Sequence, residues 1–172
     1  VSLIFALRRI REDMYFDPLT HLRNRRSLNG FITKFLRRAS EKGEVFCLIL
    51  FDLDNFKYLN DTYGHDFGDE VLVTASLLVK SAARKKDRVF RWGGEEILIL
   101  FKGGFFEAKN VAETVRNQIE KVPMQHEYET VHFTATVGVA AYEKDMTYMD
   151  LFRRVDANLY KGKNNGKNQV VG

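Results

Sequence analysis

The chain has little of what a cross-linked, disordered or membrane-spanning protein needs. Its 172 residues include one cysteine and two prolines. A single cysteine excludes a disulfide framework, and Cys47, a lone thiol inside the apolar run VFCLILF, is typical of a reducing compartment. No apolar run reaches the length of about 18 residues that a membrane-spanning helix needs. We therefore expect a cytoplasmic domain, whose full-length protein can still carry a membrane anchor upstream.

What the sequence does contain is sufficient for one globular domain. Hydrophobic residues make up 45% of the chain and charged residues 29%, which excludes a disordered tail and a fibrous repeat. The net charge of +4 permits a polyanionic ligand without requiring one. Basic residues at 23–26 and 84–86 lack interleaved aromatics, so we interpret them as solvated faces and expect no nucleic-acid partner.

Hydrophobic spacing predicts the secondary structure. Helical periodicity covers four segments, residues 28–39, 71–82, 108–122 and 151–159. Two unbroken apolar runs, residues 45–51 and 97–101, predict central strands, and alternation over residues 131–141 predicts a half-exposed strand. The glycine pair 93–94 lies between apolar segments and predicts a β-hairpin tip. The fold class is therefore α/β, a sandwich with a mostly antiparallel central sheet flanked by helices.

The first 15 residues form a separate segment. Leu3, Leu7, Ile10 and Met14 recur at the seam spacing of a two-heptad coiled coil. We interpret residues 1–15 as a linker helix and residues 16–172 as the globular domain. An amphipathic helix packed on its own domain is the alternative, because two heptads are too few to decide.

Carboxylates are placed where the most apolar strand ends. Asp52 and Asp54 follow the run 45–51, and Glu95 and Glu96 follow the hairpin glycines. If the hairpin neighbours that strand, these like charges converge and need a positive partner such as a hard divalent cation, which prefers oxygen ligands. The alternative is that Asp52 caps a helix and the glutamates are solvated.

Glycines and lysines favour a nucleotide at the same place. Gly93 and Gly94 have no side chain to obstruct a ligand. Lys57, Lys163 and Lys167 supply the positive charge that a triphosphate needs, although the sequence does not place them in space.

Four segments together resemble a known family, the GGDEF domains, which are bacterial diguanylate cyclases. They occur in the family's order and spacing over residues 17–168. The segments are DPLTHLRNRR (17–26), FDLDNFKYLNDTYGHDFGDEVL (51–72), RWGGEEI (91–97) and DANLYKGKNNGKN (156–168). The resemblance implies a palm-like fold shared with nucleotidyl cyclases, with the active site at the hairpin tip. The sequence departs from the family pattern at Ile97, Lys167 and His21, where phenylalanine, arginine and glycine are common.

The resemblance also implies a reaction. Two GTP molecules, one on each protomer of a homodimer, would join into cyclic di-GMP with release of two pyrophosphates. Asp52, the backbone carbonyl of Leu53 and Glu95 would bind two Mg²⁺ or Mn²⁺ ions, which neutralise charge at the phosphates. Glu96 would lie near the attacking 3′-hydroxyl as a proton acceptor or a second metal contact.

Further roles follow from the same resemblance. Lys57, Lys163 and Lys167 would hold the β- and γ-phosphates. Asn60 and Asp69 would recognise guanine, because a carboxylate accepts from its N1–H and 2-amino donors, a pair that adenine lacks. Taken without the motif, Asn60 is equally well interpreted as a helix C-cap and Asp69 as an N-cap before Val71.

Regulation and partners are also implied. Arg84 and Asp87 form the RxxD of a product-binding inhibitory site for cyclic di-GMP in many relatives. The linker helix would connect to an upstream sensory domain that sets the dimer geometry. The competing interpretation is a catalytically inactive module that binds cyclic di-GMP or GTP, but the retained Asp52, Gly93, Gly94, Glu95 and Glu96 favour an enzyme.

Overall fold

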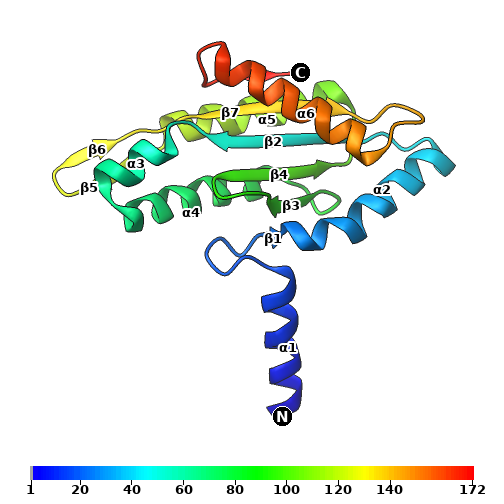
Figure 1. Ribbon diagram of the computed structural model, residues 1–172, viewed down its shortest axis with the longest axis horizontal. Coiled ribbons are helices and arrows are strands. Elements are labelled where there is room, and N and C mark those ends of the chain that lie inside the picture. The colour runs from blue at the N-terminus through cyan, green and yellow to red at the C-terminus, as the bar shows by residue number, and fades with distance from the viewer. Residues whose placement is uncertain (1) are drawn as a thin grey trace.

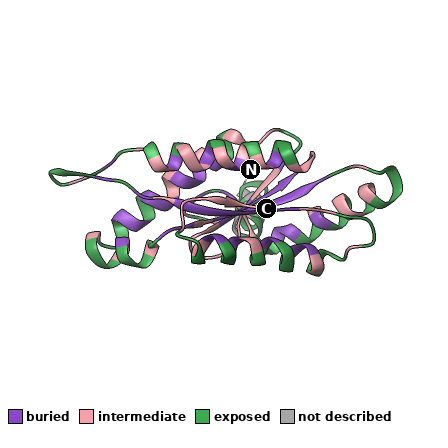
Figure 2. Ribbon diagram, turned by 90° about the horizontal axis from the view of Figure 1, so that it is seen from above, coloured by how far each residue is buried: buried purple, intermediate pink, exposed green. Residues whose placement is uncertain are grey.

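A six-stranded mixed sheet with helices on both faces forms the body of the protein (Figures 1 and 2). The computed structural model describes residues 2–172, without the side chains of residues 2, 8, 12 and 13. The strands lie in the order β1-β3-β4-β2-β7-β8. Their bounds are β1 Arg23–Asn24, β2 Cys47–Leu53, β3 Arg88–Arg91, β4 Glu96–Phe101, β7 Ala135–Ala141 and β8 Val170–Val171. The central pairs β3·β4, β4·β2 and β2·β7 are antiparallel, and the short edge strands β1 and β8 pair parallel. The predicted fold class is confirmed.

The two faces of the sheet carry different helices, because side chains of successive strand residues point to opposite faces. Leu48 and Leu50 of β2 belong to the core under α2 and α6, whereas Ile49 and Phe51 belong to the core under α4 and α5. Both faces are fully covered, which explains why β2 and β4 are unbroken apolar runs. The helix bounds are α2 Leu28–Lys42, α3 Phe56–Tyr63, α4 His65–Ala82, α5 Phe105–Lys121 and α6 Tyr148–Asn164. A 3₁₀ turn, Arg25–Ser27, precedes α2.

The strand predicted over residues 131–141 is wrong in extent and exposure. Strand β7 begins only at Ala135 and is buried along almost its whole length. Residues before it belong to a separate two-stranded hairpin, formed by β5 Met124–His126 and β6 Glu129–Val131. Of the alternating polar residues, His132 is exposed, but the hydroxyls of Thr134 and Thr136 donate to a buried carboxylate, Asp54.

Strand β2 continues two residues beyond the predicted end at residue 51. Asp52 is therefore a strand residue, paired across the ladder with Glu96 on β4 and with Thr136 on β7. The prediction stopped at the last apolar side chain, whereas the hydrogen-bonded ladder extends through the first carboxylate. This extension holds the Asp52 side chain rigidly on the face that α6 covers.

Helix α1, Ser2–Tyr15, projects away from the body of the domain (Figure 1). Its seam residues are exposed, from 70% at Leu3 to 43% at Met14. The alternative in which this helix packs on its own domain is therefore wrong. No helix within residues 2–172 combines the length and hydropathy needed to cross a membrane.

The single cysteine is a core residue. Cys47 is buried at the start of β2, and burial, with the nearby negative charge of Glu107, raises the pKa of its thiol to about 12. The thiol is therefore protonated at neutral pH and has a packing role rather than a reactive one.

Candidate active site at the hairpin tip

The hairpin between β3 and β4 brings its acidic tip to the end of β2, as predicted. Glu96 lies directly opposite Asp52 in the antiparallel ladder. The backbone N–H of Leu53 donates to the carbonyl of Glu95 at 3.3 Å, and the N–H of Trp92 donates to the carbonyl of Glu96 at 2.8 Å. Three acidic residues from segments more than 40 residues apart therefore meet at one edge of the sheet.

The two glycines of the tip have different surroundings. A Cβ on Gly93 would lie 2.4 Å from the Glu96 Oε2 atom, so the Glu96 carboxylate folds over this backbone. A Cβ on Gly94 would meet no atom within 4 Å. Gly94 thus leaves open space at the tip, which is the property expected of a surface that a ligand approaches.

An ion pair that the sequence analysis missed anchors the tip. Arg91 donates to the Gly94 carbonyl and to Asp17 Oδ1, both at 2.9 Å. Asp17 also accepts from the backbone and hydroxyl of Thr20. In the same turn His21 has φ of 54°, a left-handed conformation that explains why glycine is common there in the family. The only sequence signal for this anchor is the DPLT segment itself.

Lys163 reaches the acidic cluster from α6. Its Nζ atom lies 2.7 Å from Asp52 Oδ1 and 2.7 Å from Asp54 Oδ1, and it also donates to the Asp52 carbonyl at 3.3 Å. The Lys163 and Asp52 side chains are 23% and 19% exposed, so both are largely shielded but accessible from one side. The structure thus places Lys163 beside the carboxylates, a position that the sequence left open.

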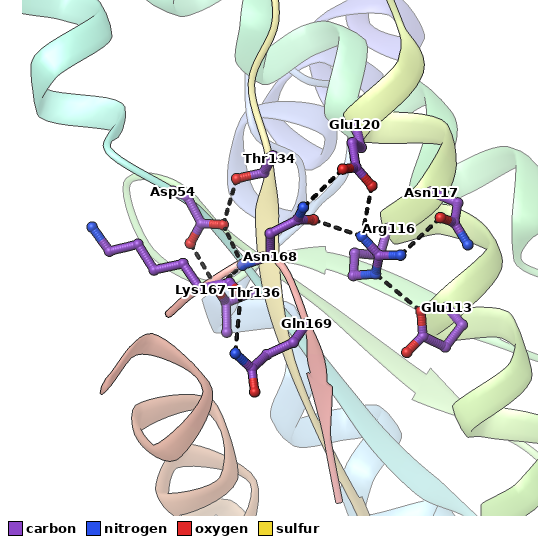
Figure 3. Close-up of polar contacts among 10 residues, drawn as sticks. All are labelled: Asp54, Glu113, Arg116, Asn117, Glu120, Thr134, Thr136, Lys167, Asn168 and Gln169. Atoms are coloured by element: carbon purple, nitrogen blue, oxygen red, sulfur yellow. Dashed lines mark hydrogen bonds and ion pairs between the residues drawn. The ribbon is translucent and has the colours of Figure 1, made fainter. Parts of the chain in front are cut away.

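Asp54 is a structural acceptor and not a member of the open cluster. Its side chain is 1% exposed. Besides Lys163 it accepts from Thr136 at 2.6 Å, from Thr134 at 2.7 Å and from the backbone N–H of Asn168 at 3.0 Å (Figure 3). Asp54 therefore joins β2, β7 and the loop after α6, a role that the sequence pattern does not distinguish from that of Asp52.

The electrostatics separate the acids into two kinds. Burial raises the pKa of Asp52, and the negative charge of Asp54 adds to this, against the opposing effect of Lys163. Burial also raises the pKa of Glu96, together with the charges of Asp52, Asp156 and Glu95. Burial acts to raise the pKa of Asp54 as well, but its bonds from Lys163, Thr136 and Thr134 outweigh burial and lower it.

The donor set fits a hard divalent cation. Asp52, Glu95 and Glu96 present only oxygen, the ligand type that Mg²⁺ and Mn²⁺ prefer. Burial first, and then repulsion from Asp52 and Glu95, raises the pKa of Glu96, and a bound cation would relieve this repulsion. Within residues 2–172 no three acidic, histidine or cysteine side chains form a preassembled metal cage. Phosphate oxygens of a nucleotide would therefore supply the remaining ligands, as is usual for Mg²⁺.

Replacing Glu96 with glutamine is expected to stabilise the metal-free domain. The raised pKa means that folding disfavours the ionised form of Glu96. The resulting loss of folding stability is absent at low pH and grows as the pH rises above the pKa that Glu96 has in the unfolded chain. We expect the melting temperature of Glu96→Gln to exceed that of the wild type by about 2–4 °C near pH 8, and by less near pH 5. The exposed α2 residue offers a matched control, Glu41→Gln, for which no change is expected. A Glu96→Gln variant that melts below the wild type near pH 8 would contradict this.

The structure places Asn60, one of the two proposed guanine-recognising residues, beside Gly68, the residue before the other, Asp69. Asn60 lies on α3 and Asp69 on α4. A Cβ on Gly68 would lie 1.7 Å from Asn60 Oδ1, so the Asn60 amide rests against the helix that carries Asp69. Both capping alternatives are wrong, because α3 ends at Tyr63 and Asp69 lies inside α4 rather than at its start.

The side chains of the other two lysines lie away from the acidic cluster. Lys57 is 89% exposed and pairs with Asp61 one turn along α3, at 2.8 Å. Lys167 donates to the side chain of Asn55, the residue that follows Asp54. Both lie on segments next to the end of β2, but only Lys163 contacts the acidic cluster.

The RxxD residues form a clamp beside a basic cleft. Asp87 is fully buried and accepts from the backbone N–H groups of Arg84 and Lys102, each at 2.8 Å. Arg84 also pairs with Asp87 at 3.1 Å and stacks over Phe101 at 4.3 Å. The adjoining cleft of about 370 Å³ is lined by charged and apolar side chains. Its basic residues include Arg23, Lys80, Arg84, Lys85 and Arg88. The Asp87 carboxylate thus binds Arg84. Because most charged residues of the cleft are arginine or lysine, its charge is positive.

Known proteins resemble this chain over most of its length. Residues 14–169 match the family described as "Diguanylate cyclase, GGDEF domain". Diguanylate cyclase DgcM of Escherichia coli K12 is 39% identical over 158 residues, which cover 91% of this chain and 38% of the relative. The chain therefore spans little more than a third of that protein.

Solved structures agree with this family in three dimensions. The coiled coil and GGDEF domain of DgcB from Caulobacter crescentus, in complex with c-di-GMP, superposes with a TM-score of 0.93 at 26% identity, covering 99% of this chain and 91% of that one. The active GGEEF domain of a diguanylate cyclase from Vibrio cholerae superposes with a TM-score of 0.80 at 35% identity, covering 86% and 95%. Sequence, fold and the acidic hairpin tip agree, and the chain belongs to the GGDEF family of diguanylate cyclase domains.

Proposed function

We propose that this domain is an active diguanylate cyclase that joins two GTP molecules into cyclic di-GMP and releases two pyrophosphates. The observation that carries the proposal is the convergence of Asp52, Glu95 and Glu96 beside Lys163 at a glycine tip with open space over Gly94. An inactive nucleotide-binding module would not need three acids at one edge, because their repulsion opposes folding. The Vibrio cholerae relative with a GGEEF signature is described as active.

Each new bond forms between the 3′-oxygen of one nucleotide and the α-phosphorus of the other, and the bond from that phosphorus to pyrophosphate breaks. We assign Glu96 to accept the 3′-hydroxyl proton, since its raised pKa brings it closer to that of an effective general base. Asp52, the Leu53 carbonyl and Glu95 would hold two Mg²⁺ or Mn²⁺ ions. When bound, such ions neutralise charge that develops on the phosphates.

Basic residues would orient the triphosphate. Lys163 is the central one, because its pKa is raised by Asp52 and Asp54 despite burial, so it remains charged when it meets a phosphate. Lys57 on α3 and Lys167 in the loop after α6 would join it, since both lie on segments next to the end of β2. The Asp69 carboxylate would accept from the guanine N1–H and 2-amino groups, and the Asn60 amide would bond the same base. An unpaired acceptor opposite adenine would disfavour ATP by roughly tenfold or more.

Catalysis would require a homodimer, since each protomer supplies half of the reacting pair. The exposed apolar seam of α1 supports dimerisation through a two-stranded coiled coil that continues into an upstream sensory domain. The Caulobacter crescentus structure is described as containing a coiled coil and a GGDEF domain.

Product binding at the Arg84 cleft is a second role that the structure supports. The clamp on Asp87 holds the Arg84 guanidinium at the edge of a cleft with several positive side chains. Arginine can stack on guanine and donate to phosphate. We propose that cyclic di-GMP inhibits the enzyme from this cleft.

The test is incubation of the purified chain with GTP and Mg²⁺, followed by chromatography of the products. A dimer-forming coiled coil fused in heptad register before α1 would ensure that a monomeric fragment does not conceal activity. We expect cyclic di-GMP and pyrophosphate in a 1:2 ratio from GTP, little product from ATP, and less product when cyclic di-GMP is added at the start. Tight GTP binding without product from the fused dimer would instead identify a receptor.

A further inference from the structure

The loop between α6 and β8 has an unusual backbone. Gly166, Lys167 and Asn168 have φ values of 108°, 63° and 45° in succession. Residues with a Cβ rarely adopt this left-handed conformation, and two in a row persist only where surrounding contacts enforce it. Lys167 is one of the two and is also a proposed phosphate-binding residue. What holds this loop therefore determines where the Lys167 ammonium lies.

Backbone bonds hold the loop to the buried acid. The N–H of Asn168 donates to Asp54 Oδ2 at 3.0 Å and to Thr136 Oγ1 at 3.1 Å (Figure 3). The N–H of Lys167 donates to the carbonyl of Gly162 at 3.0 Å, at the end of α6. These contacts attach the loop to β7 and α6 but leave the Asn168 side chain free for a further role.

The Asn168 side chain crosses the edge of the sheet to α5. Its Oδ1 accepts from Arg116 Nη1 at 2.6 Å, and its Nδ2 donates to Glu120 Oε1 at 3.0 Å. Both ends of the amide are thus paired with one helix (Figure 3). Helix α5 packs on the opposite sheet face from α6, so Asn168 joins the two helical layers at the candidate site.

Arg116 is itself fixed before it meets the loop. Its Nε donates to Glu113 at 2.9 Å, its Nη1 to Glu120 at 2.9 Å and its Nη2 to Asn117 at 2.7 Å. The side chain is only 13% exposed. Three partners on its own helix leave a single orientation for the guanidinium, in which Nη1 faces Asn168.

We propose that Arg116 and Asn168 are positioning residues that hold Lys167 at the phosphate-binding edge of the active site. The Lys167 Nζ atom lies against Asn55, the residue next to Asp54, where β2 passes into α3. The inference rests on the proposed function, because it assigns the loop to GTP phosphates. A lysine already held in place loses less conformational freedom on binding a phosphate, which favours substrate binding.

The experiment measures steady-state kinetics of the dimer-fused chain with GTP. For Arg116→Met we expect the KM for GTP to rise about tenfold, the lower end of what supporting contacts contribute, with kcat changed by less than about twofold. Asn168→Gly, which keeps the left-handed backbone accessible but removes the amide, should give the same split. The matched control is Arg154→Met, because Arg154 pairs with Glu143 on the surface, and its kinetics should equal those of the wild type.

A double-mutant cycle separates positioning from general structural support. If Arg116 acts through Lys167, then adding Arg116→Met to Lys167→Met leaves the KM of the single Lys167→Met variant unchanged. The inference would be overturned if the two substitutions multiplied their effects on KM in the double variant. It would also be overturned if KM were unchanged in both Arg116→Met and Asn168→Gly. A wild-type chain that makes no cyclic di-GMP refutes the proposed function instead. If Arg116→Met does not fold, the Asn168→Gly variant is used in the same cycle.

Discussion

Replacing Glu95 with alanine is expected to abolish cyclic di-GMP formation while leaving the domain folded. Glu95 lies at the tip, where its carbonyl accepts from Leu53 N–H, a backbone contact that alanine retains. The lost carboxylate is a proposed metal ligand, and loss of one group that stabilises the transition state typically lowers turnover by about a hundredfold to a thousandfold. Product formation from GTP and Mg²⁺ measures the loss.

Measurements of GTP binding show whether Glu95→Ala loses the chemical step or loses the substrate. Because Asn60, Asp69 and Lys163 remain in Glu95→Ala, we expect its affinity for GTP to fall by no more than about tenfold. The same replacement on the exposed face of α2, Glu41→Ala, should leave both turnover and affinity unchanged. Turnover within threefold or so of the wild type in Glu95→Ala would refute the assignment of Glu95 as a metal ligand.

The largest expected effect on stability comes from Asp54. In Asp54→Ala, two threonine hydroxyls, the Lys163 ammonium and the Asn168 N–H lose a common acceptor with 1% exposure. Breaking one side of a buried pair typically costs about 3–5 kcal/mol, a large part of the roughly 5–15 kcal/mol that stabilises a domain. Urea unfolding near pH 7 measures the free energy of unfolding.

The pH dependence identifies the cause. The pKa of Asp54 is lowered in the folded state, so its stabilisation is present above the unfolded-state value and is lost as the pH falls towards the folded-state value. The difference between wild type and Asp54→Ala should therefore shrink below about pH 4. Glu143→Ala is the control, because the ion pair of Glu143 with Arg154 is exposed and contributes about 1 kcal/mol or less. An Asp54→Ala variant as stable as this control would contradict the structural role.

Prediction from sequence failed where a polar side chain was assumed to face solvent. Thr134 and Thr136 alternate with apolar residues, and alternation normally indicates one exposed face. Here both hydroxyls face Asp54, which directly follows β2 and lies 80 and 82 positions earlier in the chain. The partner that makes a threonine stable in the core cannot be identified until the strands are paired.

The local pattern of apolar residues is enough to predict the elements whose burial is uniform. The runs of β2 and β4, the glycine hairpin and the stripes of the long helices depend on the periodicity of apolar side chains, which each segment carries by itself. The four motifs also identified the family, because their spacing does not require knowledge of which atoms touch. In these respects the sequence alone determined the class of fold and the acidic, glycine-rich chemistry of the hairpin tip.

Only the tertiary structure decided what each polar residue does. Asp52 and Asp54 are two positions apart with the same side chain, yet one lies beside Glu96 on an accessible edge and the other is a buried acceptor. Arg116 belongs to none of the four motifs and Asn168 ends the last of them, and the two meet only because the loop after α6 reaches α5 around the edge of the sheet. Hydrogen bonds and ion pairs depend on distances between atoms from distant segments, and these distances are set by how the chain packs.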